Sequence, residues 1–144
     1  MVRWALWSVV AALGVVFLAL LMLNRETGDL GGTSLRLVAY GPAEAPIPAD
    51  APATITFEAN GRVGGHTGCK GFSGSGSYRA ANGRLSFADD EMAFTTQFCD
   101  PASAEGAQDA FFREHLPGGA DYTLTNGRLI LHFDDGQVAE YVTP

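Results

Sequence analysis

Dipeptides that favour tight turns recur along this chain and constrain its fold more than any other feature. Asn-Gly occurs three times and Asp-Gly once, at Asn60-Gly61, Asn82-Gly83, Asn126-Gly127 and Asp135-Gly136. Asn-Gly readily takes the positive φ angles of a two-residue type I′ turn between antiparallel strands. Runs rich in β-branched and aromatic residues flank these turns: Thr54–Glu58, Ser77–Arg79, Arg84–Phe87, Tyr122–Thr125, Leu129–Leu131 and Val138–Val142. The sequence therefore predicts a mainly β domain, a meander of antiparallel hairpins that forms a small barrel-like sheet.

One more strand and a loop precede the first hairpin. In Ser34–Tyr40, apolar Leu35, Leu37 and Ala39 alternate with the residues between them, which is the period of a half-buried strand. Gly41–Pro52 contains four prolines and is expected to be a loop.

A single segment breaks the β pattern. Asp100 is a suitable N-cap and Pro101 a suitable first helical residue. Apolar residues then follow at helical spacing, and Pro117-Gly118-Gly119 ends the run. We predict one helix of about 15 residues that covers one opening or face of the sheet.

The N-terminal part has a different character. Trp4–Leu23 is a run of 20 residues without a charge or a proline. As a helix it would span about 30 Å, the thickness of a bilayer hydrocarbon core. We expect residues 1–24 to form a single transmembrane helix, residues 25–33 a tether, and residues 34–144 the folded domain.

The charges around this run predict its orientation. Arg3 and the free amine precede it, whereas Arg25 is offset by Glu26 and Asp29. The positive-inside bias favours a cytoplasmic N-terminus, with the domain in the periplasm on the outer face of the inner membrane. No small-x-small cleavage site directly follows Leu23, although cleavage near Gly28–Gly32 stays open as an alternative.

The acidic balance of the remainder limits its partners. All 16 Asp and Glu follow the apolar run, but only eight of the nine Lys and Arg do, so the formal charge of that part is −8. Such a domain repels phosphate backbones, and nucleic acid is not an expected partner.

Glycines crowd the segment between residues 64 and 76, which raises the possibility of a phosphate-binding loop. A P-loop requires Lys followed by Ser or Thr, yet Gly71 follows Lys70, and no helix is predicted after it. Bends and close backbone approaches in a curved sheet explain these glycines better.

Cys69 and Cys99 are the two cysteines of the chain. In an extracytoplasmic domain, an even pair most simply forms a disulfide. The alternative is a metal-binding or thiol-redox site that uses His66 with both cysteines, with His115 or His132 as a further ligand. A Cys–His nucleophile lacks a recognisable third residue, and the Asp89-Asp90-Glu91 run lacks the spacing of a calcium loop.

With these elements placed, Gly32–Tyr141 resembles a META domain, the HslJ-like family of bacterial envelope proteins. The resemblance is carried by Gly64–Tyr78, by Thr95–Cys99, by the helical Asp109–Leu116 and by Tyr122–Phe133. Three residues depart from the family's pattern: Lys70 where Asn is usual, Asp109 where Glu is usual, and Leu35 where Trp is common.

The resemblance implies a compact β-barrel-like sheet with one helix and a role in heat shock or envelope stress. It supplies no catalytic residue, cofactor or metal, and we expect no enzymatic activity. The leading hypothesis is a membrane-anchored domain that supports stress tolerance or binds an envelope partner. A carrier of small ligands inside the barrel is a further hypothesis, but large apolar side chains are expected to fill that interior: Phe57, Phe87, Phe94, Leu131 and Phe133.

Overall fold

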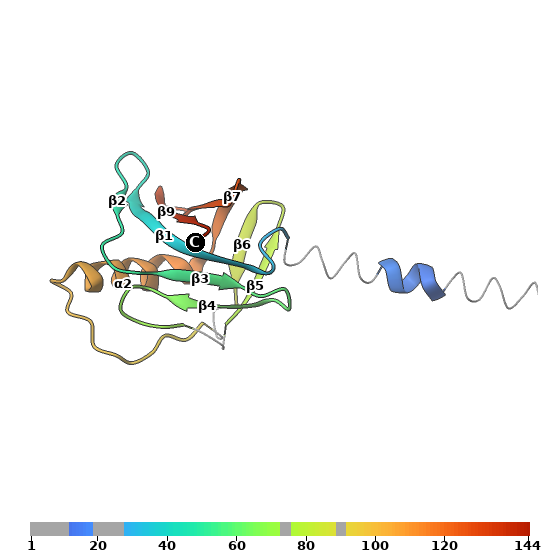
Figure 1. Cartoon of the computed structure of the whole chain (residues 1–144), viewed down its shortest axis with the longest axis horizontal. Helices are drawn as coiled ribbons and strands as arrows, with labels where there is room; N and C mark the ends of the chain where they lie inside the picture. Colours follow the sequence, from blue (N-terminus) through green and yellow to red (C-terminus); the bar gives the residue numbers. More distant parts are fainter. Residues whose placement is uncertain (1–11, 19–27, 73–75, 89–91) are drawn as a thin grey trace, which may run out of the picture.

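The computed structural model describes residues 12–18, 28–72, 76–88 and 92–144. Within these ranges the strands β1 and β3–β9 form a closed antiparallel barrel (Figure 1). The strands are β1 (Thr33–Pro42), β2 (Ile47–Pro48), β3 (Thr54–Phe57), β4 (Arg62–His66), β5 (Gly76–Ala81), β6 (Arg84–Phe87), β7 (Ala120–Thr125), β8 (Arg128–His132) and β9 (Gln137–Val142). Helix α2 (Ala104–His115) and the short η1 (Leu116–Gly118) lie between β6 and β7 in sequence. The predicted mainly β barrel with one helix is therefore confirmed.

Strand β1 closes the barrel because it pairs along both of its edges. One edge pairs with β3 over Thr33–Arg36 and with the two-residue β2 further on, while the other edge pairs with β9. A register shift between Leu37 and Ala39 marks a β-bulge in the β1–β9 ladder. The bulge also changes which side chains point inward: Leu35 and Leu37 are buried before it, and Tyr40 after it.

The two ends of the barrel are built differently. One end, here the terminal end, carries residues 28–32, the turns at 59–61, 82–83 and 126–127, and residues 143–144. The other, here the helix end, carries the turns at 43–46 and 134–136, the loop at 67–71, the segment 92–103 and α2. Figure 1 shows α2 and residues 28–32 on opposite sides of the barrel.

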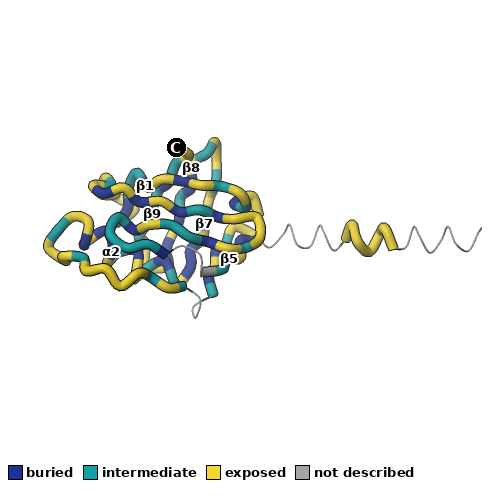
Figure 2. The backbone as a smooth tube through the Cα atoms, turned by 60° about the horizontal axis from the view of Figure 1, so that its bottom comes forward, coloured by how far each residue is buried: buried dark blue, intermediate teal, exposed yellow. Residues whose placement is uncertain are grey.

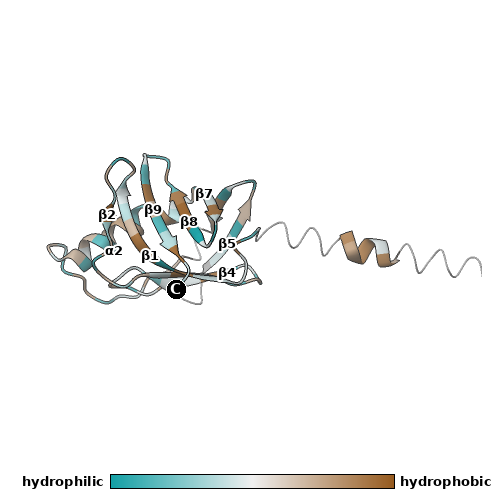
Figure 3. Ribbon diagram, turned by 45° about the horizontal axis from the view of Figure 1, so that its top comes forward, coloured by the Kyte–Doolittle hydropathy of each residue, from teal (hydrophilic) through white to brown (hydrophobic). Residues whose placement is uncertain are grey.

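The interior is filled with apolar side chains. Figure 2 shows buried and exposed residues alternating along the strands, and Figure 3 shows the matching alternation in hydropathy. The fully buried set includes Phe57, Val63, Leu85, Phe112, Leu116, Leu129 and Leu131. Of the residues expected to fill the barrel, Phe57, Phe87, Leu131 and Phe133 are buried, and Phe94 is partly buried against Phe72. Side chains thus occupy the space that a carried ligand would need.

The four predicted turns divide into two types. Asn82-Gly83 and Asn126-Gly127 have positive φ at both residues, as expected for type I′. In the other two turns only Gly61 and Gly136 have positive φ, and the loops contain three residues each. There, the side-chain oxygens of Asn60 and Asp135 each accept a hydrogen bond from the backbone N–H two residues later in the chain, at 3.1 Å in both cases. The prediction of two-residue turns was wrong at these sites. Each loop has three residues, a length that favours a turn followed by a glycine in the left-handed conformation.

Helix α2 begins later than expected. Its N-cap is Ser103, whose hydroxyl accepts a hydrogen bond from the Gly106 N–H at 3.0 Å. Asp100 instead shapes the preceding turn, in which its backbone oxygen accepts from the Ser103 N–H and its carboxylate from the Ala102 N–H. The assignment of Asp100 as the N-cap was therefore wrong, and the helix has 12 residues.

Most of the predicted transmembrane segment, 1–24, lies outside the described residues. Residues 12–18 are helical, and each of them is exposed. None of the helices within the described part of the chain is both long enough and apolar enough to cross a membrane.

The described part of the predicted tether packs on the barrel. Leu30 is fully buried, and the Gly32 N–H donates to the Phe57 oxygen at 2.7 Å. The folded domain therefore starts before residue 34, because Leu30 is needed to fill the terminal end of the core.

Candidate functional site

The disulfide predicted between Cys69 and Cys99 is present. It joins the loop after β4 to the segment before α2, with the two Cα atoms 6.1 Å apart. Both cysteines are half-buried at the helix end. In this state neither sulfur is a free thiolate, so the alternative of a metal bound by both cysteines does not fit the structure.

Hydrogen bonds made by Thr67 shape the loop that carries Cys69. The Thr67 hydroxyl accepts from the Lys70 N–H at 2.9 Å and from the Cys69 N–H at 3.3 Å. The Thr67 N–H in turn donates to the Lys70 oxygen at 2.8 Å. These hydrogen bonds fix the backbone of the loop on the side of Cys69.

Two buried polar side chains of helix α2 form hydrogen bonds with this loop. Asp109 accepts from the Thr67 hydroxyl at 2.6 Å and from Arg113 Nε at 2.7 Å. Gln108 donates through Nε2 to the backbone oxygens of Thr67 (2.8 Å) and Ala51 (3.1 Å). We call Thr67, Gln108 and Asp109 the polar clamp. All three are almost fully buried. Among the side-chain N and O atoms of the clamp, only Gln108 Oε1 lacks a hydrogen-bond partner within the described residues.

Close contacts around this loop also explain two of the clustered glycines. A Cβ at Gly68 would lie 2.5 Å from Gln108 Nε2, and Gly68 has a φ of +108°. A Cβ at Gly65 would collide with the backbone of Thr54 on β3 and lie 2.8 Å from the Phe72 ring. These glycines permit close approaches within the fold, as expected, and form no phosphate cradle.

The three histidines lie on different elements. His66 accepts from the Gly68 N–H through Nδ1 at 3.0 Å, and His132 lies exposed at the end of β8. His115, at the end of α2, forms hydrogen bonds with the Phe111 backbone oxygen at 2.8 Å and with the Asp135 carboxylate at 2.7 Å. Across the described ranges, no group of three or more His, Cys, Asp or Glu residues is arranged to hold a metal ion. The Asp89-Asp90-Glu91 run lies outside the described residues.

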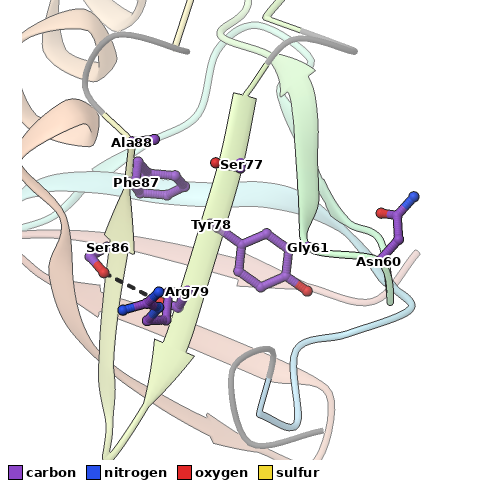
Figure 4. A pocket seen from close by; sticks show the side chains of 8 residues that line it. All are labelled: Asn60, Gly61, Ser77, Tyr78, Arg79, Ser86, Phe87 and Ala88. Atoms are coloured by element: carbon purple, nitrogen blue, oxygen red, sulfur yellow. Dashed lines mark hydrogen bonds between the residues drawn. The ribbon is translucent and has the colours of Figure 1, made fainter. Parts of the chain in front are cut away.

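A pocket of about 440 Å³ opens between the 59–61 turn and the β5–β6 hairpin (Figure 4). The Ser86 hydroxyl donates to the Arg79 backbone oxygen at 3.5 Å at one wall. Tyr78 donates its phenol proton to the Glu58 oxygen at 2.9 Å. The lining residues are Asn60, Gly61, Ser77, Tyr78, Arg79, Ser86, Phe87 and Ala88. Their hydroxyl, amide and guanidinium groups can hydrogen-bond a small ligand, and none of these described residues is a His, Cys, Asp or Glu that could serve as a general base.

A second pocket of about 520 Å³ lies outside the barrel where β1 passes from β3 to β2. Residues 49–54, which include Asp50, line it together with Ser34–Leu37 of β1 and Pro144.

Sequence reasoning identified the cysteine pair but missed the polar clamp. One signal was present, because Asp109 and Arg113 are four residues apart on a predicted helix, the spacing of an ion pair. Nothing in the local sequence indicates that Asp109 is buried or that Thr67 is its partner, since 42 residues separate them.

Comparison with known proteins agrees with this fold. The model of the META domain matches residues 29–144. An NMR structure of a protein from Burkholderia xenovorans superposes with a TM-score of 0.60 at 20% identity, over 82% of this chain and 86% of that one. A second NMR structure gives 0.57 at 18% identity, over 81% and 93%. No curated protein matches the sequence. Since the family model covers all of the barrel and its helix, this chain belongs to the META domain family.

Proposed function

We propose that this protein is a non-enzymatic META domain, anchored in the inner membrane by residues 4–23, that binds a partner in the periplasm and supports tolerance of envelope stress. The Cys69–Cys99 disulfide carries the proposal, because such bonds persist in oxidising compartments and are rare in the cytosol. The exposed apolar side chains of residues 12–18 also support it, since lipid would cover them.

The chemistry of the helix end supports binding over catalysis. The buried polar side chains there, Thr67 and Asp109, are engaged in bonds that hold the loops in place. Phe98, next to the disulfide, is 83% exposed. An exposed aromatic ring beside a disulfide is typical of a protein-binding surface, because aromatic side chains are enriched at interfaces.

Anchoring is tested by alkaline extraction of cell membranes. The full chain should stay in the membrane fraction, and a variant without residues 4–23 should be released. Release of both forms would contradict the anchor. A reporter that is active only outside the cytoplasm, fused after Pro144, should be active on the full chain and inactive on the deletion variant.

Partner binding is tested by a photo-cross-linking residue placed at Phe98, with the same residue at Ile47 as the matched control. Both side chains are exposed and apolar, and both lie at the helix end. A specific adduct from position 98 and none from position 47 is the expected result. If neither position gives a specific adduct in intact cells, the binding role at this loop is contradicted.

The thiol-redox alternative remains a second proposal. Both cysteines are only half-buried, so a reductant could reach the bond. This alternative predicts that a measurable fraction of the protein carries reduced cysteines in growing cells, whereas a structural disulfide is oxidised throughout.

A further inference from the structure

Residues 28–33 bind the terminal end of the barrel through several independent contacts. Leu30 is fully buried, and its backbone oxygen accepts from the Thr33 hydroxyl at 2.6 Å. Asp29 accepts from the Tyr122 hydroxyl at 3.1 Å, which ties this segment to β7. A Cβ at Gly28 would lie 3.0 Å from the Ala80 oxygen on β5, so the backbone passes close to the barrel wall. The chain is thus fixed to the barrel from residue 28 onward.

Only residues 24–27 separate this fixed point from the end of the apolar run at Leu23. Whatever conformation they take, five peptide steps reach at most roughly 18 Å. A chain anchored through Leu23 therefore cannot place Gly28 further than that from the edge of the hydrocarbon core. The headgroup layer is roughly 5–8 Å deep, so even a fully extended connection keeps Gly28 within roughly 13 Å of the outer surface of the headgroups.

The topology decides which part of the barrel this constraint acts on. Gly32 bonds Phe57 at the end of β3, and the turns at 59–61, 82–83 and 126–127 share that end. The disulfide, the polar clamp and α2 lie at the opposite end. In Figure 1 residues 28–32 lie on the side of the barrel that faces away from α2.

We propose that the terminal end of the barrel rests against the lipid headgroups and that the helix end, with its disulfide-linked loops, points away from the membrane. This inference rests on the anchor in the proposed function and adds an orientation to it. Exposed charges at the terminal end are of both signs: Asp29, Glu58, Arg62 and Arg128. The short connection, and not electrostatic attraction, therefore holds this face at the lipid surface.

The test uses the full chain in phosphatidylcholine vesicles that contain a headgroup spin-labelled lipid. Single cysteines carry a fluorophore at Ala59→Cys or Thr125→Cys at the terminal end, and at Ala43→Cys or Ala110→Cys at the helix end. All four positions are exposed, and the native disulfide stays closed. Fluorescence should be lost at positions 59 and 125 and retained at positions 43 and 110.

A matched variant carries a flexible Gly-Ser insertion of about 20 residues between positions 27 and 28, which extends the mean reach to roughly 25 Å. Fluorescence at positions 59 and 125 should then recover, while the barrel stays folded. Equal quenching at all four positions of vesicle-bound protein overturns the orientation but leaves the anchor intact. Protein that does not sediment with the vesicles overturns the anchor itself. Quenching that persists after the insertion shows that the face adheres by its own contacts and overturns the role of the short connection.

Discussion

Asp109 is a carboxylate that the barrel buries completely, and it has two partners on different parts of the chain. Arg113 lies on the same helix and is 44% exposed, whereas Thr67 is buried in the loop after β4. Removing the carboxylate leaves the buried Thr67 hydroxyl proton without an acceptor, whereas Arg113 can still be solvated by water.

We therefore expect Asp109→Ala to lower the free energy of unfolding by about 2 kcal/mol. Denaturant titration measures the change, with Asp121→Ala as the control because Asp121 is 71% exposed and pairs with Arg84 at the surface. The control should change stability by less than about 0.5 kcal/mol. Equal effects of the two substitutions would show that the clamp does not stabilise the fold.

The tyrosines give the molecule a sensitivity to high pH. Burial, helped by the nearby Tyr122 and Glu58, raises the pKa of Tyr78 to about 12. Burial and the hydrogen bond to Asp29 raise the pKa of Tyr122 to about 12. In the unfolded chain a tyrosine titrates near 10, so between about pH 10 and 12 the folded state holds protons that the unfolded state has released.

Stability from these phenols is fully present below about pH 10 and should fall as the pH rises toward 12. Tyrosine absorbance followed against pH should show ionisation well above 10, together with loss of structure. Ionisation of all four tyrosines near pH 10 in a protein that stays folded would contradict the buried placement.

At the scale of elements, the hairpins show how far the sequence specified the fold. Alternating apolar residues and turn dipeptides predicted every barrel strand except β4 to within a few residues, because those signals are local. The glycines of β4 were interpreted as bends. Turn type was not predictable from Asn-Gly alone, since it also depends on the number of residues between the last paired positions. Ser103 displaced Asp100 as the N-cap for a similar reason, because the geometry of the preceding turn decides which side chain faces the helix.

The two kinds of turn make a direct comparison possible. Asn126 has a φ of +52°, which alanine adopts at a cost, while Asn60 has no positive φ. We expect Asn126→Ala to destabilise the protein by about 1 kcal/mol more than Asn60→Ala, as measured by thermal or denaturant unfolding. The opposite order would mean that the hydrogen bond from Asn60 to the Arg62 N–H matters more than backbone strain.

For the whole molecule, the contacts that complete the barrel connect distant segments. Strand β1 meets β9 about a hundred residues later, Thr67 meets Asp109, and Tyr122 meets Asp29. None of these contacts could be predicted from local pattern, and the burial of Leu30 was missed because the polar and glycine residues around it resemble a linker. The resemblance to META domains, in contrast, predicted the architecture that the structure shows.

The same long-range contacts give the molecule two distinct ends. The terminal end receives the chain from the predicted anchor, and the helix end concentrates the disulfide, the polar clamp and the exposed Phe98. A membrane-anchored binding domain needs this separation, because its partner surface must be accessible from the aqueous side.

The most direct test of this account is thiol labelling of Cys69 and Cys99 in intact cells, with and without prior reduction, read by mass. We expect no labelling before reduction and labelling of both cysteines after it, because the two cysteines are paired and the proposed periplasmic location is an oxidising compartment. Free labelling of both cysteines without reduction would contradict the structural disulfide and the periplasmic placement, and would move the thiol-redox alternative ahead of the binding role.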